Sequence, residues 1–220
     1  GMHAVDPAAE LIAWPYGQFI GWGPAKTVEA AAHMPPGAIL QHNFETGGRN
    51  RQLGRWRPTW DYWLSYAGPS GLFRDCARAA VPRGTRVFAK LQVACSHEVA
   101  TTQEVPVPGI LHKKFKAMHA LGVSGAMYAW YFGAYPALMT RAAGELAFAP
   151  FPAKPREFLL SLARRDWGRH AGTVVRAWRW FERGYGNYPT AHLFGYYGPM
   201  HDGPVWPLYL GRKAFVPSAP

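Results

Sequence analysis

Short apolar segments alternate with helical patterns along the first two thirds of the chain, and this order limits what the chain can fold into. The segments with strand character are residues 11–14, 38–44, 86–94 and 123–130. Helical patterns lie between them at residues 25–33, 70–81 and 110–121, the second expected to be capped by Ser70. Because a helix between two strands returns the chain to the end of the sheet where the first strand began, this order predicts parallel strands joined by right-handed crossovers.

The last third of the chain has a different pattern. Residues 155–167 and 171–183 are expected to form two helices, and an irregular, aromatic-rich tail with many Pro and Gly residues runs from residue 185. Residues 46–57 are expected to form a long loop rich in Gly and Arg. We therefore expect an α/β unit over residues 2–148, and a helical extension with its tail over residues 149–220 that packs on the same domain.

Composition excludes several classes of protein. With 220 residues, 49% apolar and 15% aromatic, the chain can bury a full hydrophobic core, which excludes a disordered protein. Its longest weakly polar segment, residues 123–139, is too short and too often interrupted to cross a membrane. Gly1 before Met2 is typical of a cleaved tag, and no signal peptide is expected here. Cys76 and Cys95 lack the spacing of a disulfide framework or a zinc site, so both are expected to be buried thiols.

The formal charge of +11 raises the question of a nucleic-acid partner. The densest basic cluster consists of Arg49, Arg51, Arg55 and Arg57. Two further clusters have helical spacing and are expected to be solvated helix faces: Lys113, Lys114 and Lys116, and Arg164, Arg165 and Arg169. No known nucleic-acid-binding motif is present, so nucleic acid is a disfavoured partner and remains a third alternative.

Two carboxylates occupy positions typical of a catalytic site. Glu45 and Glu98 each follow an expected strand directly, at its carboxyl end, where ligand and catalytic groups gather in parallel α/β proteins. Cleavage of a glycosidic bond needs two such carboxylates. We predict Glu98 as the first catalytic residue and Glu45 as the second. The alternative is that either residue only bonds backbone groups or pairs with the arginines of residues 49–57.

Aromatic and polar residues near strand ends and in the carboxyl-terminal tail favour a sugar ligand. Aromatic rings offer a stacking surface to the C–H face of a sugar, while neighbouring polar groups bond its hydroxyls. The residues predicted to bind substrate are His97, Trp130, Tyr131, Trp14, Asp61, His201, Asp202 and Trp206.

Other chemistries lack their sequence signatures. Three adjacent residues such as Ser96, His97 and Glu98 cannot converge as a catalytic triad, and no GxSxG motif is present. No HExxH spacing supports metal binding by His42, His97 or His201, and no Gly-rich phosphate loop supports a nucleotide. We therefore predict no metal and no cofactor.

Several segments resemble the carboxyl-terminal half of a group of bacterial (β/α)8-barrel proteins that are similar to glycoside hydrolases. The segments are AWPYGQF (13–19), NFETGG (43–48), KLQVACSHEVAT (90–101), VPVPG (105–109), LGVSGAMYAWYFGAYPALM (121–139), AAGELAF (142–148) and YYGPMHDGPVWPL (196–208). The resemblance implies that the four strands are barrel strands five to eight, with Glu98 as nucleophile at the mouth of the seventh and Trp130 at the eighth. The usual acid/base follows the fourth strand, which has no counterpart in this chain.

Together these observations predict a half barrel of four parallel strands that binds or cleaves a carbohydrate, in particular an anionic polysaccharide. If the chain is an enzyme, we expect a glycoside hydrolase. A carbohydrate-binding or assembly module without catalysis is the alternative. Because four strands cannot close a barrel, we expect a homodimer, or a missing amino-terminal half-barrel as partner, or a sheet edge covered by the tail.

Overall fold

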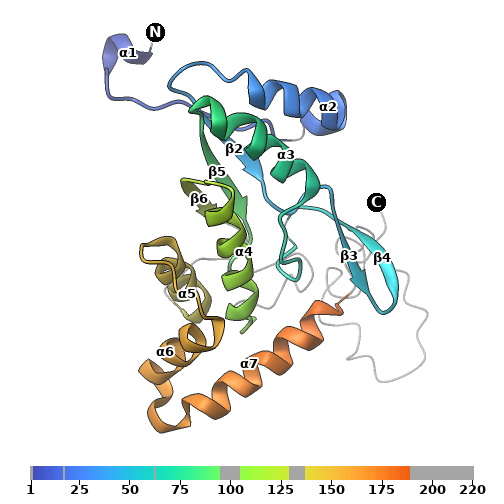
Figure 1. Cartoon of the computed structure of the whole chain (residues 1–220), viewed down its shortest axis with the longest axis vertical. Helices are drawn as coiled ribbons and strands as arrows, with labels where there is room; N and C mark the ends of the chain where they lie inside the picture. The colour runs from blue at the N-terminus through green and yellow to red at the C-terminus, as the bar shows by residue number, and fades with distance from the viewer. Residues whose placement is uncertain (1, 17, 62, 95–104, 129–136, 189–220) are drawn as a thin grey trace, which may run out of the picture.

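The four expected strands form one open parallel sheet. The computed structural model describes residues 2–16, 18–61, 63–94, 105–128 and 137–188 (Figure 1). The strands, in their order across the sheet, are β1 (Ile12–Ala13), β2 (Ile39–Asn43), β5 (Arg86–Leu91) and β6 (Gly125–Tyr128). All neighbouring pairs are parallel. The α/β class with four parallel strands is therefore confirmed, and within the described residues the sheet does not close into a barrel.

A helix follows each strand of the sheet. These helices are α2 (Gln18–Ala32), α3 (Gly71–Ala80), α4 (Pro108–Ala120) and α5 (Leu138–Ala147), and a short helix α1 (Met2–Val5) precedes β1. Figure 1 shows α3 and α4 on the same side of the sheet. The predicted cap is confirmed, because the Ser70 hydroxyl accepts a hydrogen bond from the backbone N–H of Phe73 at 3.1 Å. Cys76 is a buried free thiol on α3, and burial raises its pKa to about 12.

The two faces of the sheet differ in chemistry. Side chains alternate between the faces along each strand. One set joins the apolar core with the helices and includes Leu40, Phe44, Val87, Ala89 and Leu91. The alternate set is polar where the strands end and includes Gln41, Asn43 and Lys90, all buried. Register places Asn43 beside Lys90, and Lys90 beside Met127. The face opposite the helices thus carries a row of polar groups near the carboxyl ends of the strands.

The prediction of a loop over residues 46–57 is wrong, because these residues form most of a β-hairpin. Strands β3 (Gly48–Gln52) and β4 (Arg55–Thr59) pair antiparallel. Leu53 and Gly54 form the two-residue turn, both with positive φ, of 49° and 77°. This geometry is typical of the turns that join two twisted strands. The sequence pattern missed the hairpin because Arg and Asn occupy strand positions where an apolar alternation was sought.

The two helices expected in the last third are present. They are α6 (Pro155–Trp167) and α7 (Ala171–Gly186), which follow one another at the bottom of Figure 1, where α7 runs toward the hairpin. Val175, Trp178 and Tyr185 bury one side of α7. The tail beyond residue 188 lies outside the described residues. Among the described helices, none has both the length and the apolar character that a membrane span requires.

Gly125 on β6 gives a test of how closely the sheet is packed. A Cβ atom at this position would lie 2.3 Å from the ring of Phe88 on the neighbouring strand. We expect Gly125→Ala to lower the free energy of unfolding by about 1–3 kcal/mol, because the ring must move from a packed position. Urea denaturation measures the change. Gly144→Ala on α5, where a Cβ meets no atom within 4 Å, is the matched control and should be neutral or stabilising. Equal stability of Gly125→Ala and the native protein would contradict this packing.

Candidate functional site

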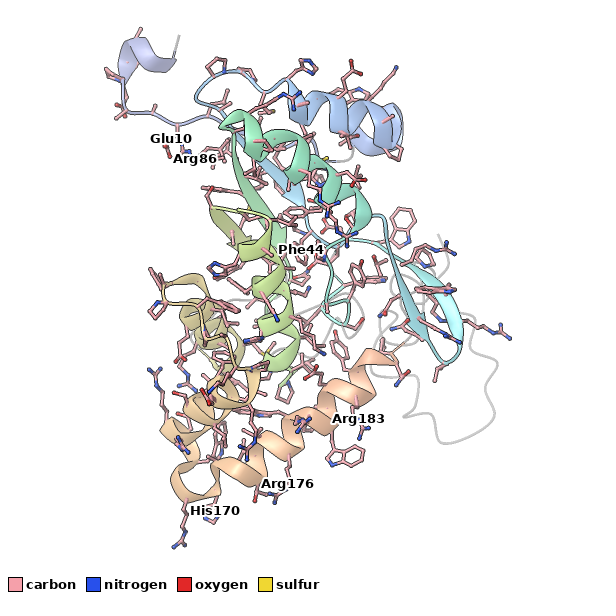
Figure 2. The ribbon with its side chains drawn as sticks, in the orientation of Figure 1. Glu10, Phe44, Arg86, His170, Arg176 and Arg183 are labelled. Carbon is pink, nitrogen blue, oxygen red and sulfur yellow. The ribbon has the colours of Figure 1, made fainter. Side chains whose placement is uncertain are left out.

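The carboxyl ends of β2 and β5 carry a connected set of buried polar side chains. Figure 2 shows Glu10 and Arg86, an ion pair of 2.5 Å, at the amino end of the sheet, and Phe44 near the other end. Phe44 directly follows β2, so the polar set begins at its neighbours Asn43 and Glu45. This is the edge where parallel α/β proteins place their ligands. We therefore treat it as the candidate site.

Asn43 joins two of the residues that the sequence predicted to bind substrate. Its side-chain amide donates to the Asp61 carboxylate at 3.2 Å and to the Thr46 hydroxyl at 3.3 Å. Its side-chain oxygen accepts a hydrogen bond from the indole N–H of Trp14 at 3.0 Å. The Trp14 ring also lies 4.9 Å, between centroids, from that of Tyr16. Trp14 and Asp61 are 47 positions apart in the sequence, and both bond Asn43 at the end of β2.

Lys90 holds the other oxygen of Asp61. The Lys90 ammonium donates to Asp61 Oδ1, and its side chain has no exposed surface, whereas that of Asp61 is 12% exposed. Burial lowers the pKa of Lys90, and the nearby carboxylates of Asp61 and Glu45 oppose that shift. Asp61 comes from the segment after the hairpin, so this ion pair fixes that segment to the middle of the sheet.

Glu45 is held by three other parts of the chain. Its side chain is 0% exposed, and Oε1 accepts from the ammonium of Lys114 at 2.5 Å and from the backbone N–H of Gln92 at 3.1 Å. Its backbone carbonyl accepts a hydrogen bond from the Thr59 hydroxyl at 2.7 Å. Burial raises the pKa of Glu45, and the charges of Lys114 and Lys90 oppose the rise. Of the alternatives that the sequence left open, pairing with the arginines of residues 49–57 is replaced by pairing with Lys114.

Three buried polar atoms at this edge have no hydrogen-bond partner among the described residues. They are Oε2 of Glu45 and both side-chain atoms, Oε1 and Nε2, of Gln92. The Gln92 side chain is 0% exposed and lies one alternation beyond Lys90. A buried amide without a partner costs about 1–3 kcal/mol, so such a group in a native protein calls for a water molecule or a ligand. The edge therefore holds one buried acceptor and one buried amide whose hydrogen bonds the described residues do not supply.

The expectation that Lys114 lies on a solvated helix face is wrong. Lys113 and Lys116 are exposed, but Lys114 is completely buried beside Leu111, Phe115 and Met118 on the inward side of α4. Residues 111, 115 and 118 recur at the helical spacing of one apolar face, and position 114 falls on that face. The periodicity of α4 could thus have identified Lys114 as a buried ion.

Asn43, Lys90 and Gln92 were also missed as site residues. All three lie within the apolar segments 38–44 and 86–94 that the sequence predicted to be strands. A polar side chain in such a strand must be buried, and a buried polar group needs a partner. Their presence inside these strands was therefore a usable signal.

All of the remaining predicted site residues lie outside the described residues. These are Glu98, His97, Trp130, Tyr131, His201, Asp202 and Trp206. His42 is buried, with Nδ1 3.1 Å from the carbonyl oxygen of Asn43, and burial lowers its pKa. Within the described part of the chain, no three His, Cys, Asp or Glu side chains come close enough together to hold a metal ion.

Comparison of the chain with models of protein families, with curated proteins and with solved structures finds no match in any of the three. Interpretation of the edge therefore depends on its own geometry.

The Lys114–Glu45 pair can be tested by removing the cation. Lys114→Met keeps most of the side-chain volume but leaves a buried carboxylate without its counter-ion, and we expect the free energy of unfolding at about pH 7 to fall by about 3–5 kcal/mol. Lys113→Met is the matched control on the same helix. Its ion pair with Glu182 lies at the surface, so its loss should cost less than about 1 kcal/mol. Similar urea midpoints for the two variants would contradict the buried pair.

The pH dependence of the same variant tests the charge on Glu45. Burial raises the pKa of Glu45, so without Lys114 the folded state takes up a proton at a higher pH than the unfolded state does. Proton uptake removes the unpaired charge, and the deficit of Lys114→Met should therefore shrink as the pH falls from about 8 to about 5. Urea denaturation of the native protein and the variant across this range gives the deficit. A deficit that is constant or grows on acidification would show that charge is not its cause.

Proposed function

We propose that this protein binds a carbohydrate at the carboxyl edge of its parallel sheet, in an arrangement similar to half of a glycoside-hydrolase barrel. The observation that carries the proposal is the pair of buried, unpartnered groups on Glu45 and Gln92, beside the polar network of Asn43, Asp61 and Lys90. A ligand that reaches this edge gains hydrogen bonds that the protein alone does not make.

The unpartnered groups match the chemistry of sugar hydroxyls. A hydroxyl donates one hydrogen bond and accepts others, so adjacent hydroxyls can satisfy a carboxylate oxygen and both atoms of an amide together. The carboxylate of Asp61 keeps some exposed surface, which makes it the described acidic group best placed to meet a ligand. Trp14 and Tyr16 lie beside the same network and offer ring faces to a sugar.

Strand order supports the half-barrel part of the proposal. Four parallel strands lie in the order in which they occur in the sequence, with a helix after each one, as consecutive strands of a (β/α) barrel do. The polar face with Asn43 and Lys90 then corresponds to the interior of a barrel, where sugars bind at the carboxyl end. The segments that resemble glycoside-hydrolase-like barrels point the same way. A second copy or an amino-terminal half-barrel would supply the missing strands.

For hydrolysis we propose Glu98 as the nucleophile, since it follows β5 in the sequence. Glu45 is fully buried and bonded to Lys114 and to the backbone of Gln92, so we assign it a positioning role in place of direct attack. A binding module without catalysis is the second candidate. It is favoured by the observation that Asp61 and Glu45 each share one oxygen with a lysine.

A screen with aryl glycosides and with polysaccharides separates the two candidates. If the protein is a hydrolase, Glu98→Gln should lower the rate on the best substrate by about two orders of magnitude or more while binding persists. Glu29→Gln, at an exposed position of α2, is the control and should keep full activity. Saccharide binding without hydrolysis by the native protein would favour the binding module. Hydrolysis unaffected by Glu98→Gln would discard the role of Glu98.

Replacing each of two buried glutamines by methionine tests whether the sheet edge binds the ligand. The side chain of Gln92 has no partner among the described residues, whereas that of the equally buried Gln52 donates to the backbone oxygens of Gly186, at 3.2 Å, and Tyr188. We expect Gln92→Met to raise the free energy of unfolding by about 1–3 kcal/mol and Gln52→Met to lower it by a similar amount. Titration calorimetry with the saccharide from the screen should show weaker binding for Gln92→Met only. Loss of stability in Gln92→Met with unchanged binding would contradict the proposed site.

A further inference from the structure

Helix α7 presents an exposed surface whose chemistry differs from the rest of the helix. Its inner side buries Val175, Trp178 and Tyr185, while Trp180 and Phe181 are 68% and 54% exposed. Three arginines lie on the exposed part of the helix: Arg176, Arg179 and Arg183. Figure 2 shows Arg176 and Arg183 on the side of α7 that faces away from α4.

The arginines and Trp180 line a common cavity. Its volume is about 430 Å³, and its lining comprises Arg176, Arg179, Trp180, Glu182 and Arg183. The spacing of three and four residues places the three guanidinium groups along one face over about 10 Å of helix. The guanidinium carbon of Arg183 lies 5.1 Å from the ring centre of Trp180, a cation–π contact. The cavity therefore combines three cations with one flat ring.

Positive charge in this cavity is not balanced by the described residues. Glu182, the acidic residue of the lining, forms an ion pair of 2.5 Å with Lys113 on α4. Arg176 donates to the neutral hydroxyl of Thr173 at 2.9 Å. Across the part of the chain that the structure describes, none of the three arginines has a carboxylate within ion-pair distance. An anionic ligand would supply the missing charge.

Trp180 also borders an apolar groove. The groove has a volume of about 610 Å³, and its lining includes Val105, Ala177, Phe181, Gly184, Tyr185 and Tyr188. The surface around Trp180 is thus cationic on one side and apolar and aromatic on the other. Sugar rings present C–H faces that stack on such side chains, while carboxylate or sulfate groups form paired hydrogen bonds with guanidinium groups.

We propose that α7 carries a binding site for an anionic polysaccharide, centred on Trp180 and the three arginines, in addition to the site at the sheet edge. The two sites use different residues, so either can exist without the other. Among the described residues of the lining, every cation is an arginine and none is a lysine, which fits recognition of planar or branched oxyanions by paired hydrogen bonds.

The hairpin extends the same chemistry beyond the end of α7. Gln52 on β3 donates to the carbonyl oxygens of Gly186 and Tyr188, so the two elements are in contact. On the hairpin the guanidinium of Arg49 lies 5.8 Å from the ring centre of Trp56, which is 63% exposed. A second pair of Arg and Trp therefore lies on the element that contacts α7. A polymeric ligand of several sugar units could contact both pairs.

The test compares binding of three polysaccharides to the full-length chain. Polygalacturonate carries only carboxylates, dextran sulfate only sulfates, and dextran no charge. We expect one or both anionic polymers to bind in low-salt buffer, with the preferred polymer identifying the oxyanion, and dextran to bind much more weakly. Arg179→Gln and Trp180→Ala should each lower the affinity about tenfold or more, since each removes a principal contact.

Matched controls separate the site from general charge and from folding. Arg78→Gln on α3 changes an exposed arginine elsewhere, and Trp22→Ala on α2 removes another exposed indole. Both should retain affinity within about twofold. All four substitutions are at exposed positions, and thermal unfolding should confirm that the variants remain folded.

Three results would overturn the proposal: no binding of either anionic polymer, equal losses in the control and the α7 variants, or tighter binding of single-stranded DNA than of both polymers with loss in the same variants. The last result would assign the surface to nucleic acid. Failure here would leave the sheet edge untouched, because hydrolysis and binding of small glycosides in the Arg179→Gln variant report on that edge separately.

Discussion

The Glu45 residue connects four separate parts of the structure, and the geometry of the sheet edge depends on these contacts. Its carboxylate pairs with Lys114 on α4 and accepts the backbone N–H of Gln92 after β5, while its carbonyl holds Thr59 at the end of the hairpin. A buried carboxylate is unfavourable unless it is paired and hydrogen-bonded, so this arrangement tolerates little displacement of any partner. The ion pair and these two hydrogen bonds together fix the helix, the hairpin and two strand ends relative to one another.

This constraint separates the polar groups of the edge into two kinds. Asp61, Lys90 and Asn43 satisfy one another and form the fixed part of the network. The Gln92 amide and one oxygen of Glu45 lie against that network without partners among the described residues. A protein that is stable by a few kcal/mol keeps such a cost when function requires the groups, which is why the edge is the part of the fold that we connect with ligand binding.

The sequence predicted the sheet well because each strand is a short apolar run between helices, and both signals are local. It predicted Trp14 and Glu45 from their places near strand ends, and Asp61 as a carboxylate outside the expected helices. The structure brings all three into neighbouring contacts. The partners that hold them were missed. Lys90 and Lys114 were treated as ordinary strand and helix residues, although an apolar strand and an apolar helix face, respectively, require that they be buried.

The hairpin was missed because its strands are made of Arg, Asn and Gln, which carry no apolar alternation. Pairing between residues distant in sequence, such as Lys114 with Glu45, is set by the packing of α4 on the sheet, which local patterns do not specify.

At the carboxyl edge of the sheet, we propose that the side-chain amide of Gln92 binds a hydroxyl-bearing ligand. Heteronuclear NMR of the side-chain amide groups, recorded with and without the saccharide that the protein binds, measures this directly. We expect the side-chain resonance of Gln92 to shift on binding, and that of the hydrogen-bonded Gln52 to stay unchanged. Saturation with ligand that leaves the Gln92 resonance unchanged would contradict the claim and would place the ligand elsewhere on the protein.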